Sequence, residues 1–201
     1  MATKKSRKKK IKNVSFKVGE FIVYPAHGVG KVTSIDQEVI AGFDIEVYVV
    51  AFEQDKMTLR VPTAKAATSG MRALSNDLIL KDAFTTLRGR ARIKRTMWSR
   101  RAQEYEAKIN SGDLVLLSEV VRDLHRTDDQ PDQSYSERQL YENAIDRMVR
   151  EVAAIKKATR SAAMEDIIET LTLARQKAAA KAAAKAEAEA DNDEDGGEAA
   201  A

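Results

Sequence analysis

Hydrophobic residues in the first third of the chain fall in short runs that are separated by turn residues. Residues 14–62 contain 16 Val, Ile or Thr and six of the eleven aromatic residues, a composition typical of β-strands. Glycine and proline stand between or beside these runs, where tight turns need them. Four or five short strands in so few residues predict a small, strongly bent antiparallel barrel, with strands at 21–24, 31–40, 45–52 and 58–61.

After about residue 75 the apolar residues recur with the spacing of helices. Side chains that cap helices stand at the expected starts, and glycine or a polar linker follows several of the expected ends. Residues 178–190 are mostly alanine and have no apolar stripe, so we expect this stretch to fray out of a helix. Helices are predicted from 76 or 77 to 87, at 97–110, from 113 to 124, from 134 or 136 past 155, and around 164–174.

These patterns predict an α+β multidomain protein, in which a small N-terminal β barrel precedes an all-α helical bundle. We place a disordered basic tail at 1–13, the barrel at 14–72, the bundle at 73–177 and an Ala-rich helix that frays into an acidic tail at 178–201. The expected inward positions of the bundle include Leu114, Leu117, Val120, Val121 and Leu124 in the third helix, Leu140, Ala144, Met148, Val152 and Ile155 in the fourth, and Met164, Ile167, Ile168, Leu171 and Ala174 in the fifth.

The two ends of the chain carry opposite charges that cancel, so the net charge of +3 belongs to the residues between them. Residues 1–12 carry seven basic groups and no acid, whereas residues 187–201 carry seven acids and no base. The chain has no cysteine, which excludes disulfides and thiolate chemistry and fits a reducing cytoplasm. No window approaches about 18 consecutive apolar residues, and no apolar segment follows the basic N-terminus. We therefore expect a cytoplasmic protein that does not bind membranes.

Catalytic chemistry has little support in the sequence. The residues HGVGK at 27–31 resemble a phosphate-binding loop, but Pro25 and Val32 stand where that motif requires glycine and a hydroxyl residue. We interpret the segment as a turn whose glycines supply positive φ. The two histidines, His27 and His125, are far apart in sequence and have no recognisable partners for a triad or a metal site. We predict that the protein is not an enzyme and needs no metal or other cofactor.

Residues 88–101, here called the basic segment, are the one unusual charge feature between the two tails. Seven of these fourteen residues are Arg or Lys, none is acidic, and the segment contains the only tryptophan, Trp98. An aromatic ring framed by arginines suits an unstacked base step, while the planar guanidinium groups hold backbone phosphates. The pattern predicts a DNA-binding surface made by Arg92, Lys94, Arg95, Trp98, Arg100 and Arg101.

A second interpretation of Trp98 stays open on the sequence alone. Tryptophan is usually at least partly buried, so the ring also fits a core anchor of the bundle, with the basic residues as a solvated helix face. Blue-shifted, quencher-protected fluorescence of the free protein would favour the anchor. Red-shifted, accessible emission would favour a ring that wedges into DNA.

Seven short motifs, separated along the chain, carry a resemblance to a known family. They are Phe16-Lys-Val-Gly-Glu20, Val23-Tyr-Pro-Ala-His-Gly-Val-Gly-Lys31, Arg60-Val-Pro62, Gly70-Met-Arg72, Trp98-Ser-Arg-Arg101, Lys108-Ile-Asn-Ser-Gly-Asp113 and Glu119-Val-Val-Arg-Asp-Leu124. In this order they resemble the CarD/CdnL family of bacterial transcription regulators. The resemblance covers about residues 14–174, which is everything except the tails.

The resemblance implies a Tudor- or SH3-like N-terminal domain that binds the β subunit of RNA polymerase, and a helical domain that meets promoter DNA. Such proteins stabilise the open promoter complex at the upstream edge of the melted bubble. Trp98 matches the family's wedge tryptophan, and Arg100 and Arg101 match the neighbouring basic positions. The face that docks on the polymerase is matched by Val39, Ile40, Arg60 and Pro62.

Two positions depart from the family pattern. Glu38 stands where some members carry a basic residue at the polymerase contact, and Gln103 stands where some carry lysine near the DNA. We expect a monomer that binds the polymerase β subunit and promoter DNA with weak sequence specificity. The alternatives are an architectural DNA-binding protein that acts without polymerase, and an adaptor that binds only proteins and buries Trp98.

Overall fold

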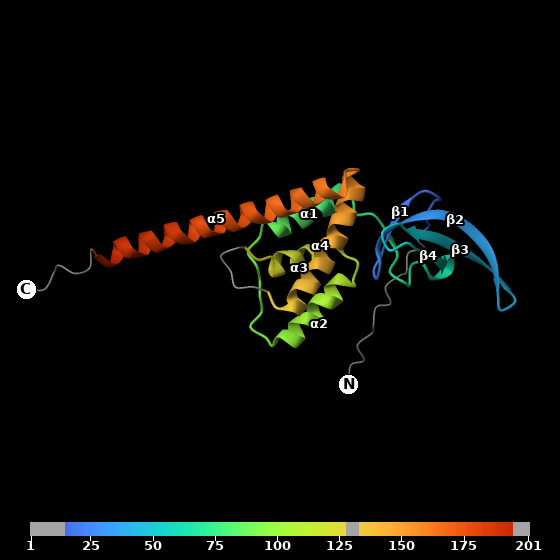
Figure 1. Ribbon diagram of the computed structural model, residues 1–201, viewed down its shortest axis with the longest axis horizontal. Coiled ribbons are helices and arrows are strands. Elements are labelled where there is room, and N and C mark those ends of the chain that lie inside the picture. The colour runs from blue at the N-terminus through green and yellow to red at the C-terminus, as the bar shows by residue number, and fades with distance from the viewer. Residues whose placement is uncertain (1–14, 128–132, 195–201) are drawn as a thin grey trace, which may run out of the picture. The chain divides into compact units, whose positions relative to one another are not determined.

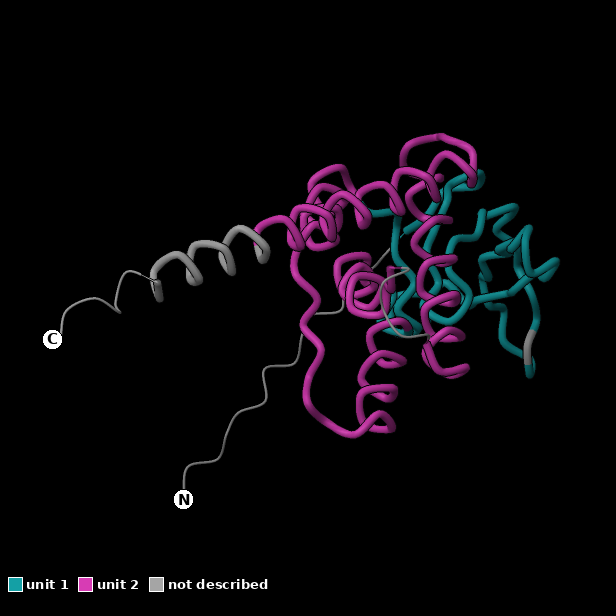
Figure 2. The backbone as a smooth tube through the Cα atoms, turned by 60° about the vertical axis from the view of Figure 1, so that its left-hand side comes forward, with its two compact units in different colours: residues 1–75, 110–112 teal, residues 76–109, 113–201 magenta. Residues whose placement is uncertain are grey.

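The computed structural model of this chain describes residues 15–127 and 133–194, with the backbone alone for Ile40 and residues 182–194. The basic tail expected at 1–13, the linker at 128–132 and the end of the acidic tail lie outside the described residues. The chain divides into two compact units, shown in Figure 2. The first comprises residues 1–75 with 110–112, and the second comprises residues 76–109 with 113–201.

The first unit is built on one antiparallel sheet of five strands in the order β4-β3-β2-β1-β5. The strands are β1 (Phe21–Tyr24), β2 (Gly28–Ile40), β3 (Phe43–Phe52), β4 (Met57–Pro62) and β5 (Arg72–Ala73), and the short helix η1 (Thr63–Lys65) follows β4. A bulge between Val32 and Ser34 shifts the register of β2 against β3, and bulges of this kind bend and twist a sheet. The bent antiparallel sheet agrees with the sequence, and Figure 1 shows its curvature.

Closure of this sheet into a barrel is not confirmed. Among the described residues β4 pairs with β3 alone, and β5 pairs with β1 over only two residue positions. The two edge strands therefore do not join. Apolar side chains from the strands and from the segments around them still form one core, which comprises Phe16, Ile22, Val32, Tyr48, Val50, Phe52, Val61, Ala66 and Met71.

The two glycines of the HGVGK turn have different roles. Gly28 has a φ of +79°, as expected for a turn glycine. Gly30 does not have positive φ, so that expectation was wrong for it. A Cβ at Gly30 would lie 2.7 Å from Cε1 of Phe52 and 2.7 Å from Cγ1 of Val50. Gly30 is therefore required by the close approach of two core side chains.

Replacement of Gly30 by alanine is expected to destabilise the first unit. The added methyl group would collide with Phe52 and Val50, and overpacking of this kind costs about 1–3 kcal/mol. Urea denaturation should show a lower midpoint for Gly30→Ala than for Thr58→Ala, which changes an exposed residue of β4. Equal midpoints for the two variants would contradict this account of the glycine.

The second unit consists of five helices, labelled in Figure 1. They are α1 (Asp77–Leu87), α2 (Trp98–Ile109), α3 (Leu114–Leu124), α4 (Tyr135–Lys156) and α5 (Arg160–Glu194). The expected caps are present: Asn76 accepts from the N–H of Ile79, Asp113 caps α3, and Ser134 forms a capping box with Glu137. The backbone of α5 stays helical through the Ala-rich stretch to Glu194, further than expected, because alanine has the highest helix propensity.

Most of the bundle core lies where the apolar spacing placed it, although Leu140, Ile155 and Ile168 are only partly buried and Ala174 lies outside the core. Leu114, Leu117, Val120, Val121 and Leu124 of α3 are all buried among residues from α1, α2, α4 and α5. Met164, which was expected to face inward from α5, is instead 37% exposed. No helix in the described part of the chain combines the length and the apolarity needed to cross a membrane.

Candidate nucleic-acid interface

The first part of the basic segment crosses from α1 to α2 without regular secondary structure, as the green stretch between these helices in Figure 1. Its backbone is tied to α3, because the N–H of Arg92 donates to Oδ1 of Asp123 over 2.9 Å. Asp123 also pairs with Arg122, whose Nη2 lies 2.7 Å from the same oxygen, and both side chains are buried. The buried ion pair thus holds the backbone of the segment at Arg92, while the side chains of Arg88, Arg90, Arg92 and Arg95 are exposed.

Trp98 is the first residue of α2 and is half-buried. Its ring packs against the bundle core, with its centroid 6.5 Å from that of Tyr105. The indole Nε1–H donates to Oγ of Ser136 in α4 over 3.0 Å. The guanidinium of Arg101 lies 5.5 Å from the ring centroid, within the range of a cation–π contact. The ring is therefore held in one orientation, partly anchored in the bundle and partly open to solvent.

Two of the five basic residues among the predicted DNA-binding residues have side-chain partners within the protein. Arg101 is largely buried by its neighbours: Nη1 donates to the carbonyl of Lys94 over 3.4 Å, and Nη2 lies 3.9 Å from Glu137. The ammonium of Lys94 lies 2.6 Å from Glu104. This hydrogen bond lowers the pKa of the Glu104 carboxyl. The geometry makes Arg101 a support for Trp98 and gives Lys94 a carboxylate partner.

Arg92, Arg95 and Arg100 differ from this pair. All three are exposed and form no ion pair with another described residue. Exposed guanidinium groups on a fixed backbone suit contacts with backbone phosphates, which position a protein on DNA without reading the sequence. These arginines and the partly exposed Trp98 form the candidate DNA-binding surface.

The structure also contains a buried polar cluster next to the basic segment, around Arg122 and Asp123, which the sequence did not predict. In addition to the buried pair of Arg122 and Asp123, Arg175 of α5 donates from Nη2 to the carbonyl of Arg122 over 2.7 Å. Nδ1 of His125 lies 2.9 Å from the hydroxyl of Tyr141. Burial raises the pKa of Tyr141 to about 12 and lowers the pKa of Arg175. The sequence feature that could have predicted this cluster is the charged pair Arg122 and Asp123, which stands within the apolar stripe of α3.

His125 gives the stability of the bundle a pH dependence of known sign. Burial, with a smaller contribution from the charge of Arg175, lowers the pKa of His125. The unfolded chain then binds a proton that the folded chain does not, so the free energy of unfolding should fall as the pH drops below about 6.5, by at most about 1.4 kcal/mol per pH unit. Urea unfolding at about pH 7.5 and about pH 5.5 should show this loss. An equally large loss in His125→Gln would contradict the assignment.

The residues predicted to meet the polymerase lie on β2 and β4. Val39 is 72% exposed beside the β2–β3 turn, and Phe43, which the sequence analysis missed, is also 72% exposed. Ile40 pairs with Phe43 in the sheet. The turn itself uses Ala41 and Gly42 at φ of 53° and 82°, as in the tight turns that connect two antiparallel strands. The hairpin therefore presents an apolar tip to solvent.

Arg60 and Glu38 form an ion pair on the sheet, with Nε of Arg60 3.1 Å from the carboxylate. Because successive side chains of a strand point to opposite faces, Val39 lies on the face opposite this pair. Pro62 is half-buried at the end of β4, whose outer edge pairs with no other described strand. The structure thus separates the predicted docking residues into an apolar tip, an ion pair and an open strand edge.

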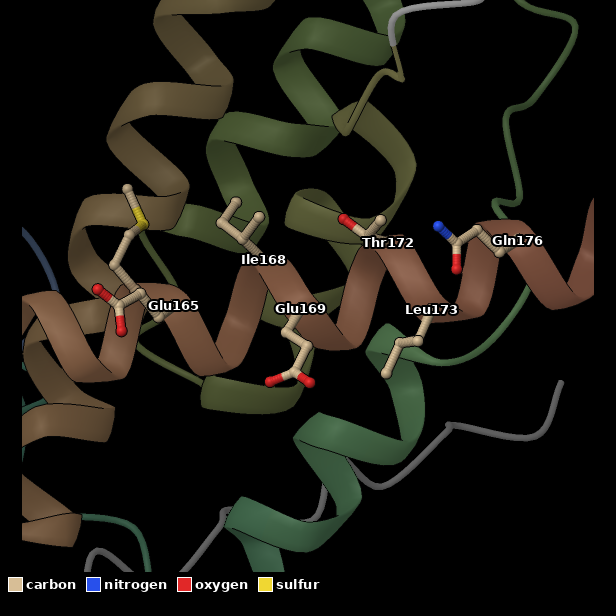
Figure 3. Close-up of a pocket in the computed structure, with 7 residues that line it drawn as sticks. Glu165, Ile168, Glu169, Thr172, Leu173 and Gln176 are labelled. Atoms are coloured by element: carbon tan, nitrogen blue, oxygen red, sulfur yellow. The ribbon is translucent and has the colours of Figure 1, made fainter.

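The α5 helix carries a pocket of different character, shown in Figure 3. Its lining side chains all come from this helix and are apolar, acidic or neutral: Met164, Glu165, Ile168, Glu169, Thr172, Leu173 and Gln176. Two carboxylates without a basic side chain in the lining would repel phosphate. This pocket is therefore not assigned to the candidate DNA-binding surface.

The sheet unit presents an exposed apolar hairpin, and the helical bundle presents exposed arginines beside Trp98. Together these two units define a modular binding protein. Comparison with known proteins identifies the family to which this binding protein belongs. The model described as "CarD-like/TRCF RID domain" matches residues 16–75, and the model described as "CarD, C-terminal domain" matches residues 82–169. The protein named "Putative transcription factor YdeB" of Bacillus subtilis (strain 168) is 29% identical over 144 residues, which cover 72% of this chain and 94% of that protein.

The chain belongs to the CarD family of transcription regulators. The two domain models match in the order in which the sheet unit and the bundle follow each other in the chain. The resemblance to this family that the seven motifs indicated is confirmed.

Proposed function

We propose that this protein docks on the β subunit of RNA polymerase through a Tudor-like sheet unit, and stabilises the open promoter complex through the basic segment. The observation that carries the proposal is the placement of Trp98, which is held by Ser136 and Arg101 and is partly exposed beside exposed arginines. A ring fixed before binding loses little conformational freedom on binding. The upstream fork of the melted bubble offers an unstacked base step to receive it.

Stabilisation of the open complex follows from a contact that the closed complex does not offer. A ligand shifts a two-state equilibrium only by its difference in affinity for the two states. A contact between Trp98 and an unstacked base exists only when the DNA is melted, and about 1.4 kcal/mol from it would shift the ratio of open to closed complexes tenfold. The phosphate contacts of Arg95 and Arg100 hold the register and read no sequence.

Docking on the polymerase is supported by the family match of the first unit and by three of its surface features. The outer edge of β4 has the geometry that receives a strand from a partner. The tip with Val39 and Phe43 supplies apolar area, and Arg60 supplies a charge that Glu38 balances in the free protein. Docking raises the effective concentration of the bundle at the promoter, so the DNA contact itself needs little affinity.

The polymerase contact is tested by binding of the full chain to the cognate bacterial RNA polymerase. Val39→Ala and Arg60→Ala are each expected to weaken binding by roughly tenfold, because each removes the side chain of one proposed contact, the apolar tip or the charge on β4. Glu53→Ala changes an exposed residue of the β3–β4 turn and serves as the control. Unchanged affinity in both variants, or an equal loss in the control, would contradict the proposed docking surface.

An architectural DNA-binding protein that acts without polymerase is the second candidate, and the exposed Arg92, Arg95 and Arg100 favour it. The two functions differ in the affinity they require. Architectural proteins bind duplex DNA on their own, whereas a factor tethered to polymerase does not need to. Failure to bind polymerase, together with tight, salt-dependent binding to duplex DNA, would establish the second function in place of the first.

A further inference from the structure

We propose that Trp98 is the centre of a larger base-binding surface, which Met97 and Tyr135 complete, and that this surface takes an unpaired base of the melted DNA. The inference rests on the proposed function and extends it to two residues that the family motifs do not include. Met97 is 80% exposed and Tyr135 is 72% exposed. Met97 directly precedes Trp98, and Tyr135 directly precedes Ser136, the residue that accepts the indole hydrogen bond.

Local structure fixes both residues beside the tryptophan. The carbonyl of Met97 accepts from the N–H of Arg101 over 3.1 Å, so Met97 is anchored at the start of α2. Tyr135 is the first residue of α4, directly after the capping box of Ser134 and Glu137. The contact between Trp98 and Ser136 thus brings together the starts of two helices, and with them the backbone positions of Met97 and Tyr135. The side chains of Met97 and Tyr135 are both more open to solvent than that of Trp98.

The exposure of Met97 and Tyr135 is unusual enough to require an explanation. Met97 has the highest exposed fraction among the large apolar side chains that the structure describes. Single exposed apolar residues are common on protein surfaces, but two of them beside a half-buried tryptophan make a patch, and such patches mark binding sites. The patch costs hydration free energy in the free protein, which binding of an apolar surface would recover.

Charge identifies nucleic acid as the occupant. Arg95 and Arg100 stand in the chain two residues before and three residues after Met97, and both are exposed. The guanidinium of Arg138 lies 6.0 Å from the ring centroid of Tyr135. Apolar and aromatic side chains within a basic rim suit an unpaired base flanked by phosphates, since every base offers a flat face for stacking. Methionine is also one of the side chains that wedge between base steps.

The division of roles follows from the contacts of each residue. Trp98 is held by Ser136, Tyr105 and Arg101, so it presents a fixed platform. Met97 is 80% exposed beside it in the chain and offers a side chain of a type that wedges between base steps. Tyr135 offers a second ring on which a displaced base stacks.

The lifetime of open complexes with the cognate polymerase tests this surface. Met97→Ala and Tyr135→Ala are each expected to shorten the lifetime by roughly fivefold or more, the usual effect of removing one stacking side chain. Met97→Leu and Tyr135→Phe keep the apolar contact and should retain most of the effect of the unaltered protein. Leu78→Ala removes another exposed apolar side chain, 68% exposed in α1, and is the matched control.

The outcomes distinguish failure of the extended base-binding surface from failure of the proposed function. If the unaltered protein prolongs the lifetime and both alanine variants do so equally well, the extended surface is wrong and the proposed function stands. If the unaltered protein has no effect, the proposed function fails. The extended surface is then tested by binding of the full chain to forked DNA with 2-aminopurine at the fork. Both alanine variants are expected to bind this DNA more weakly than the unaltered protein, and equal binding would overturn the inference. Loss of polymerase binding in these variants would show that the patch meets protein and would overturn the inference.

Discussion

Replacement of Trp98 by alanine is expected to reduce the lifetime of the open promoter complex nearly to its value without the protein. Trp98 is held in one orientation by its hydrogen bond to Ser136 and is still partly exposed. Loss of even about 1.4 kcal/mol of contact made only in the open state shortens the lifetime tenfold. The measurement is the decay of heparin-resistant complexes formed by the cognate polymerase and its housekeeping sigma factor.

The controls for this experiment separate DNA contact from folding. Trp98 also packs against the bundle core, so the variant must be shown to keep its helical circular dichroism and its affinity for polymerase. Trp98→Phe keeps an aromatic ring but loses the hydrogen bond to Ser136, and it should keep part of the effect. A folded, polymerase-bound Trp98→Ala protein that prolongs the lifetime as well as the unaltered chain would show that this ring does not meet the melted DNA.

Replacement of Asp123 by alanine is expected to produce the largest loss of stability, about 3–5 kcal/mol. The substitution leaves the buried guanidinium of Arg122 without its carboxylate and removes the acceptor for the N–H of Arg92. Because total stabilities are only about 5–15 kcal/mol, the bundle would be largely unfolded under mild denaturing conditions. Thermal and urea denaturation followed by circular dichroism measure the effect.

The matched control for this variant is Asp82→Ala, which removes an exposed carboxylate from α1 and should change the free energy of unfolding by less than about 0.5 kcal/mol. A double variant, Arg122→Met with Asp123→Leu, replaces the pair by apolar side chains. Replacement of both partners avoids a buried unpaired charge, so the double variant should be more stable than Asp123→Ala. A double variant that is less stable than the single one would contradict the role assigned to the pair.

Local sequence signals predicted most of the elements in this fold. The Val- and Thr-rich runs became strands, the 3.6-residue spacing became helices, and Asn76, Asp113 and Ser134 cap α1, α3 and α4 as expected. These features depend on residues close together in the chain, so a single sequence contains them. Closure of the sheet depends instead on pairing between β4 and β5, and no local pattern encodes it.

The same distinction explains what was missed at the site. The composition of the basic segment was visible in the sequence, but the partners of its side chains were not. Lys94 meets Glu104 and Arg101 meets Glu137, and the second contact joins residues from two helices. Gly30 was predicted to be a turn glycine with positive φ. The structure shows that glycine is needed there because Phe52, from a strand distant in the sequence, approaches it closely. Which of these basic side chains pair with a carboxylate of the same protein is therefore a property of the tertiary structure.

The most direct test of the proposed function is the lifetime of open promoter complexes with and without the unaltered protein. Complexes of the cognate polymerase and its housekeeping sigma factor are formed on a promoter, challenged with heparin and sampled over time, after binding of the protein to polymerase has been verified. The account predicts a lifetime that is longer by roughly tenfold when the protein is present. An unchanged lifetime at saturating, polymerase-bound protein would contradict it.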